Sequence, residues 1–161
     1  MMSQNAMVAT GQITEIVSAR IKPGVDVIEG LLSVCQDQNI TAGSIEVLVG
    51  GSNAAKLIVP VPDPSSPSGV GPKQIEVPHP VAFTGGQGMV CTRDSGEIEI
   101  HLHVSVVDDE RLYGGDLVKG SAIVTTTADA IICRIEGATF LRKFDPTANA
   151  VVFHPMTAED G

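Results

Sequence analysis

Apolar and polar residues alternate strictly over residues 97–106, and this pattern predicts a β-strand with one apolar and one polar face. The apolar positions are Ile98, Ile100, Leu102, Val104 and Val106. The polar positions are Glu97, Glu99, His101, His103 and Ser105. A polar segment at residues 108–111 predicts a turn immediately afterwards. We therefore expect this strand to present its apolar face to the core and its two histidines to the opposite side.

A helical period appears near the N-terminus, after the turn signal Pro23-Gly24. Asp26 is a favourable N-cap for a helix over residues 27–38. The apolar residues at helical spacing are Ile28, Leu31, Leu32 and Cys35. They predict one amphipathic helix with a buried stripe.

The remainder of the chain consists mainly of short segments rich in β-branched residues. We expect strands at residues 12–21, 44–49, 54–61, 73–77, 81–84, 89–91, 122–127, 130–135, 139–144 and 151–153. The Pro-, Ser- and Gly-rich residues 63–72 predict an exposed loop. The Gly-Gly-Gln-Gly run at residues 85–88 predicts a turn or bulge between two strands. Together these elements predict an antiparallel α+β fold.

The chain length fits one compact domain. We place this domain at residues 12–155, between a flexible N-terminal arm at residues 1–11 and a C-terminal tail at residues 156–161. Neither side of the loop at residues 63–72 looks complete without the other, so this loop is not a linker between domains.

Two histidines on one strand face predict a possible metal site. His101 and His103 stand at i and i+2, about 6–7 Å apart along a strand. If the chain reverses after the turn, Asp116, which follows Gly114-Gly115, brings a carboxylate to the same face. Two imidazoles and a carboxylate suit a first-row divalent metal with positions left for water. The alternative is that these are ordinary surface residues beside an ordinary turn.

The charge balance argues against nucleic acid as a direct partner. The net charge is −9, from 19 acidic and 10 basic residues, and the basic residues do not cluster. Such a chain is expected to repel a phosphate backbone.

The three cysteines, Cys35, Cys91 and Cys133, each lie in an apolar segment and predict buried free thiols in a reducing compartment. With no secretory signal or membrane-spanning run visible, we expect a cytoplasmic protein.

Two linked motifs resemble the PPC domain family, also called DUF296, which includes the PD1-like proteins of prokaryotes. The first is His-Leu-His-Val at residues 101–104, and the second is Gly-Gly-Asp-Leu at residues 114–117, where the family has Gly-Gly-His-Leu. Arg20 with Pro23-Gly24, and Gly50-Gly51 before the next strand, also follow the family pattern. The resemblance extends from about residue 12 to residue 152.

The resemblance implies a curved, mostly antiparallel sheet packed by one main helix, assembled as a homotrimer. It also implies a divalent metal, zinc in the family, held by histidines that correspond to His101, His103 and position 116. Here position 116 is Asp, whose shorter side chain and harder oxygen change both reach and metal preference. The site is then expected to bind zinc more weakly, to select another ion, or to bind none.

Two classes of function fit these observations. The first is a homo-oligomeric, trimeric binding or regulatory protein that recognises a protein partner or a small ligand. The family label is DNA binding, but the sequence has no Arg-Gly-Arg-Pro AT-hook element such as the plant relatives carry. The second is a small metal-dependent enzyme, a hydrolase or lyase, that uses His101, His103 and Asp116. No catalytic residue beyond these metal ligands can be assigned from the sequence.

Overall fold

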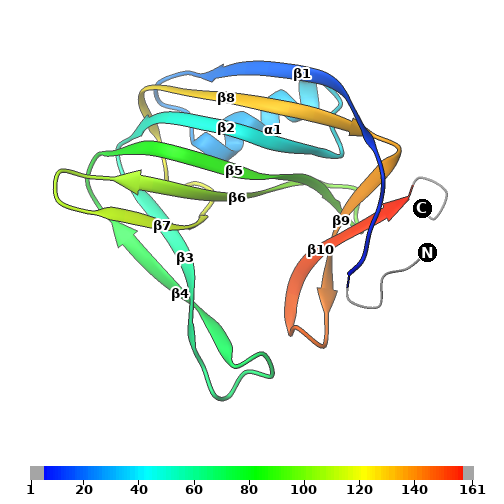
Figure 1. Cartoon of the computed structure of the whole chain (residues 1–161). Helices are drawn as coiled ribbons and strands as arrows, with labels where there is room; N and C mark the ends of the chain where they lie inside the picture. Colours follow the sequence, from blue (N-terminus) through cyan, green and yellow to red (C-terminus); the bar gives the residue numbers. More distant parts are fainter. Residues whose placement is uncertain (1–5, 158–161) are drawn as a thin grey trace.

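A computed structural model of the protein describes residues 6–157 and contains one helix and ten strands within that range. Figure 1 shows their arrangement. In chain order the elements are β1 (Gln12–Ile21), α1 (Val27–Asp37), β2 (Gly43–Ser52), β3 (Ala55–Pro62), β4 (Val70–Val77), β5 (Val81–Arg93), β6 (Ile98–Val107), β7 (Leu112–Leu117), β8 (Val124–Glu136), β9 (Ala138–Asp145) and β10 (Ala150–Thr157).

The strands form one curved sheet with the order β1-β8-β2-β5-β6-β7-β3-β4. Every pair in this path is antiparallel. The β9–β10 hairpin joins the sheet through a short parallel pairing of β9 with the end of β5. In Figure 1 the β3–β4 and β9–β10 hairpins extend away from the rest of the sheet on the same side. The predicted fold, a curved and mostly antiparallel sheet with one main helix, is confirmed.

Helix α1 begins where the sequence predicts, at Val27, and ends at Asp37, one residue before the predicted end. The Asp26 side chain accepts hydrogen bonds from the backbone N–H groups of Ile28 (3.0 Å) and Glu29 (3.1 Å). Its other carboxylate oxygen accepts from the N–H of Ala122 at 3.1 Å. A single buried carboxylate therefore caps the helix and ties it to the segment that leads into β8.

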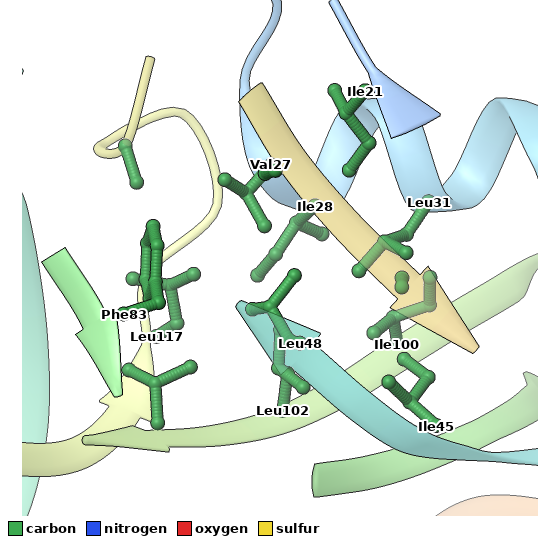
Figure 2. Packing of buried hydrophobic residues seen from close by; sticks show 14 of the residues in the cluster. Ile21, Val27, Ile28, Leu31, Ile45, Leu48, Phe83, Ile100, Leu102 and Leu117 are labelled. Carbon is green, nitrogen blue, oxygen red and sulfur yellow. The ribbon is translucent and has the colours of Figure 1, made fainter. Parts of the chain in front are cut away.

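The apolar face of α1 packs against the sheet and closes the core (Figure 2). Leu31 and Cys35 of the helix and Leu48 and Leu102 of the sheet are fully buried. All four apolar residues of β6 from Ile100 to Val106 belong to this core. Each large side chain buried there contributes roughly 1.5–3 kcal/mol. Because strand side chains alternate, His101 and His103 lie on the face of the sheet opposite the helix.

The predicted division of residues 81–91 into two strands is wrong, because β5 continues through residues 85–88. The expected irregularity is present only as a register shift between Phe83 and Gly85. A Cβ at Gly88 would lie 2.2 Å from the backbone oxygen of His101, and one at Gly86 would lie 2.8 Å from Leu48 Cβ. These two glycines therefore allow neighbouring strands to approach closely and do not reverse the chain.

Three other boundaries also differ from the sequence prediction. The loop at residues 63–72 is shorter, because β3 and β4 pair from Ala55–Val77 out to Pro62–Val70. The two strands predicted within residues 122–135 are one strand, β8, whose central residues pair with both β1 and β2. Strand β10 extends to Thr157, into the predicted tail, and residues 158–161 of that tail lie outside the described part of the chain. Residues 1–5 of the predicted arm also lie outside it. In each case backbone pairing across the sheet extends a strand through residues of weak local preference.

Across residues 6–157, no helix combines the length and the apolar character that crossing a bilayer requires.

Replacing Asp26 by Ala is expected to lower the free energy of unfolding by about 2–4 kcal/mol, because the helix loses its cap and the Ala122 N–H loses its acceptor. Asp26→Asn keeps one oxygen acceptor and is expected to cost less. Asp37→Ala, at the exposed end of the same helix, serves as the matched control. Urea unfolding measures all three, and equal values for Asp26→Ala and Asp37→Ala would contradict this account.

Candidate metal centre

The pairing of β6 with β7 brings together all three residues that the sequence proposes as metal ligands. His103 lies directly opposite Asp116 in this antiparallel ladder. His101 is two residues before His103 and therefore projects from the same face of β6. The chain reversal on which the sequence prediction depended is therefore present, and Asp116 lies beside both histidines.

The turn between β6 and β7 sets this register. One carboxylate oxygen of Asp108 accepts hydrogen bonds from the N–H groups of Glu110 (2.7 Å) and Arg111 (2.6 Å). The N–H of Asp108 also donates to the carbonyl of Arg111 at 3.1 Å. These backbone donors stabilise the charged carboxylate and hold the pKa of Asp108 below its usual value. The short, well-bonded turn leaves β7 one favoured alignment along β6.

The donor atoms of the three side chains lie within 4.8 Å of one another. The Nε2 atoms of His101 and His103 are 3.1 Å apart, and the two rings meet edge to face. Nδ1 of His101 is 3.3 Å from Oδ2 of Asp116. Two nitrogens bound to one tetrahedral zinc ion are about 3.4 Å apart, as follows from Zn–N bonds of about 2.0–2.1 Å. The spacing of the two Nε2 atoms is therefore compatible with a shared ion.

Asp116 can act in this cluster in either of two ways. A carboxylate oxygen can be the third ligand. Alternatively, the carboxylate can accept a hydrogen bond from Nδ1–H of His101, which leaves Nε2 free as the ligand nitrogen and fixes the ring orientation. Both arrangements favour a divalent cation, because the carboxylate adds negative charge beside two neutral imidazoles. The His/His/Asp cluster has the donors needed to hold a metal ion.

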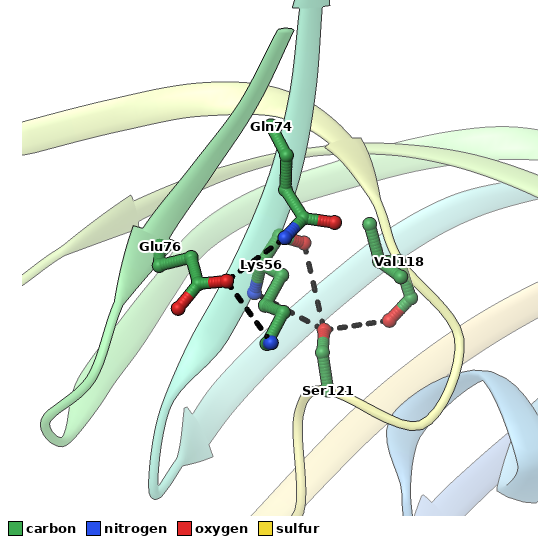
Figure 3. A network of polar contacts seen from close by, with 5 residues as sticks. All are labelled: Lys56, Gln74, Glu76, Val118 and Ser121. Atoms are coloured by element: carbon green, nitrogen blue, oxygen red, sulfur yellow. Dashed lines mark hydrogen bonds and ion pairs between the residues drawn. The ribbon is translucent and has the colours of Figure 1, made fainter.

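Contacts between β3 and the segment that follows β7 lie just beyond Asp116 in the chain (Figure 3). The N–H of Val118 donates to the carbonyl of Lys56 at 3.0 Å, and the N–H of Lys56 donates to Oγ of Ser121 at 3.1 Å. Oγ of Ser121 donates to the carbonyl of Val118 at 2.6 Å. The Lys56 ammonium also pairs with Glu76 of β4 at 3.1 Å and lowers the pKa of that carboxyl. The β3–β4 hairpin is thereby fastened to the end of β7.

A pocket of about 460 Å³ opens beside His103 and Asp116. One side is formed by the β3–β4 hairpin and its tip, which contributes the hydroxyl groups of Ser65, Ser66 and Ser68. Residues 148–150, at the turn of the β9–β10 hairpin, form part of the opposite side. The sequence analysis treated the serine-rich segment only as an exposed loop, because nothing in its local pattern indicates which distant residues it meets.

The cysteines are not part of this cluster. All three are buried and free. Burial raises the pKa of Cys35 and of Cys91 to about 11, although the Arg142 guanidinium near Cys91 acts in the opposite direction. Both thiols are therefore protonated at neutral pH, which makes them poor ligands and poor nucleophiles.

The Gly114-Gly115 pair offers a direct test of how β7 is positioned. A Cβ at Gly115 would lie 2.7 Å from the carbonyl oxygen of Ile58, whereas one at Gly114 would lie 3.6 Å from its nearest neighbour. Because the added methyl group would clash with β3, Gly115→Ala is expected to push β7 away from β3. The free energy of unfolding is expected to fall by about 1–3 kcal/mol. Gly114→Ala is the matched control and is expected to have a much smaller effect. Chemical unfolding measures the stability of both variants. Equal destabilisation of the two would contradict this role of Gly115.

Several solved structures share the fold of this chain. A metal-containing protein from Archaeoglobus fulgidus is 19% identical, with a TM-score of 0.80 over 92% of this chain and 99% of the other. A plant- and prokaryote-conserved (PPC) protein from Pyrococcus horikoshii is 20% identical, with a TM-score of 0.74 over 91% and 96%. A Bacteroides thetaiotaomicron protein named "putative DNA-binding protein" is 16% identical, with a TM-score of 0.68 over 90% and 96%.

No curated protein matches the chain in sequence. The sequence profile of the Plants and Prokaryotes Conserved (PCC) domain does match, over residues 8–136. This family is the one that the His-Leu-His-Val and Gly-Gly-Asp-Leu motifs indicate. Because the match covers well over half of the residues, the chain belongs to the PCC domain family.

Proposed function

We propose that this PCC-domain protein binds a divalent metal ion at His101, His103 and Asp116, and that it acts as a self-associating, trimeric binding or regulatory protein. The observation that carries the metal proposal is the convergence of the three donor side chains within 4.8 Å. The similar fold of the metal-containing protein from Archaeoglobus fulgidus supports this proposal.

The chemistry of the donors indicates which ions suit the site. Two imidazoles and one carboxylate can bind several first-row divalent ions, including Zn²⁺. Replacing the third imidazole of the family pattern by the oxygen of Asp116 favours harder ions relative to zinc. We therefore propose that the cluster binds Zn²⁺, with a lower affinity than a site of three histidines would have.

Substitution of the three residues tests the metal proposal. His101→Ala is expected to lower Zn²⁺ affinity by more than about 100-fold, beyond the ~10–100-fold typical of losing an outer-shell contact. Asp116→His, which recreates the family's third imidazole, is expected to raise it. His154→Ala, in β10 and outside the cluster, is the control. Isothermal titration with Zn²⁺ on tag-free protein measures each affinity, and a wild-type protein that binds neither Zn²⁺ nor Mn²⁺ would refute the proposal.

The self-association proposal rests on apolar side chains around the metal centre. Val47 and Val49 of β2, Met89 of β5 and Ile58 of β3 are each about 40% exposed. Met89 lies opposite His101, and Ile58 lies opposite Asp116. Val47 and Val49 line the hollow next to His103. A row of exposed apolar residues across one sheet face is typical of a surface that a partner covers, and we assign a second and third copy of this chain as that partner.

Replacing Val47 by Glu is expected to dissociate the assembly without unfolding the chain, because the new charge would have to be buried at the interface. Val25→Glu, in the turn before α1 and as exposed as Val47, is the control. Light scattering coupled to size exclusion at micromolar concentration should give three times the chain mass for the wild type and for the control. A monomeric wild type would overturn this part of the proposal.

A metal-dependent hydrolase or lyase is the second candidate, and the pocket of about 460 Å³ beside His103 and Asp116 favours it. A bound divalent ion would supply Lewis-acid chemistry at that position. The serine hydroxyls of the β3–β4 tip would orient a polar substrate, and the apolar side chains of Ile58 and Val70 would exclude water.

This alternative predicts turnover of a small ester or phosphoester by metal-loaded protein, with at least about 100-fold loss in His101→Ala. A screen of such substrates with loaded and chelated wild type provides the measurement. If the metal-loaded protein shows no more activity than the chelated protein, the hydrolase or lyase alternative is refuted and only the binding function remains.

Direct nucleic-acid binding is not part of the proposal. The net charge of −9 opposes binding to a phosphate backbone, although two proteins of similar fold carry a DNA-binding name.

A further inference from the structure

A second cavity adjoins the metal centre on its other side. Strand β7 pairs with β6 only as far as His103 and Asp116, so among residues 6–157 no strand pairs with this edge of β6 before His103. A cavity of about 320 Å³ occupies this position. We call it the Arg142 pocket; its lining includes His101 and Asp116 of the metal centre, Glu99 of β6, Arg93 of β5 and Arg142 of β9.

Arg142 reaches the pocket through the short parallel pairing of β9 with β5, which places it opposite Arg93. Its side chain is only 13% exposed. Nε of Arg142 is 3.8 Å from Oε1 of Glu99, and this buried N–H has no hydrogen-bond partner among the described residues. Because a buried donor without an acceptor is destabilising, the guanidinium is suited to bind an acceptor from outside the chain.

Glu99 cannot neutralise both arginines of the pocket. Its Oε2 lies 2.7 Å from Nε of Arg93 in an ion pair without hydrogen-bond geometry, whereas its Oε1 lies 3.8 Å from Nε of Arg142. One carboxylate thus lies between two guanidinium groups, and the more deeply buried guanidinium, that of Arg142, has the weaker contact.

The charges around the cavity balance only while the metal site is empty. The lining carries three cations, Arg93, Lys119 and Arg142, and three carboxylates, Glu97, Glu99 and Asp116. A divalent ion held by His101 and Asp116 adds two positive charges. The loaded site therefore has excess positive charge, and an anion that reaches both the ion and Arg142 would reduce it.

The remaining lining indicates the rest of the ligand. Ile28 and Leu32 of α1 and Ile58 and Ile98 of the sheet supply apolar surface. The volume lies at the small end of the range for ligand pockets. A planar guanidinium matches the two oxygens of a carboxylate. These features fit a short-chain carboxylic acid better than a bare inorganic anion.

We propose that the Arg142 pocket binds a small aliphatic carboxylate, with the carboxylate group between the metal ion and the Arg142 guanidinium and the hydrocarbon part against Ile28 and Leu32. This inference rests on the proposed metal function and assigns the ligand class of that site.

Cobalt-loaded protein provides the test, because the visible spectrum of Co²⁺ responds to a change in its ligands. Co²⁺ is titrated first, and isovalerate is then added to the loaded protein and followed by absorbance and calorimetry. We expect the spectrum to change on addition of isovalerate. We expect Arg142→Gln to lower isovalerate affinity at least ~10-fold while leaving Co²⁺ affinity nearly unchanged. Arg142→Lys keeps the charge but cannot form the bidentate hydrogen bonds of a guanidinium. Its isovalerate affinity is expected to lie between those of the wild type and Arg142→Gln.

Lys73→Gln, which removes one positive charge outside the pocket, is the matched control and should behave as wild type. Circular dichroism verifies that each variant is folded, and Arg142→Lys alone suffices if Arg142→Gln does not fold. Protein that binds Co²⁺ but not isovalerate retains the metal function and overturns this inference, as does isovalerate binding that is unaffected at position 142. Protein that binds inorganic phosphate but no isovalerate overturns the assignment of the ligand as a carboxylate. Protein that binds no Co²⁺ overturns both proposals.

Discussion

The antiparallel pairing of β6 with β7 is the interaction on which the rest of the site depends. Its register places His103 opposite Asp116, and the alternation of strand side chains adds His101 to the same face. A slip of one residue in this ladder would send Asp116 to the core side of the sheet and break the cluster. Backbone hydrogen bonds that carry no functional chemistry therefore determine whether the three donors meet.

The same strand serves stability and function through its two faces. One face of β6 supplies Leu102 and its apolar neighbours to the core beneath α1, which makes β6 difficult to displace. The other face carries the two histidines. Because one rigid strand holds both, the histidine spacing is as well determined as the core packing, an arrangement that favours precise metal geometry.

The surroundings of the cluster come from distant parts of the chain. The β3–β4 hairpin, fastened to the end of β7 through Lys56 and Ser121, forms part of one pocket, and β9 brings Arg142 to the other. The sheet thus offers two approaches to the same three donors, one lined by hydroxyl groups and one by guanidinium groups. Whether the chain acts as a binding protein or as an enzyme depends on what occupies these two cavities.

The sequence by itself determined the local features: the alternation that makes β6 a two-faced strand, the Asp26-capped helix, and the two histidines on one face. These follow from periodicities of two and 3.6 residues, which need no knowledge of distant neighbours. Only the tertiary structure decided that residues 85–88 continue β5, that the serine-rich tip of the β3–β4 hairpin lines a pocket, and that Arg142 lines a cavity together with His101 and Asp116. Those outcomes depend on pairings between segments far apart in the chain, whose register local propensity does not encode.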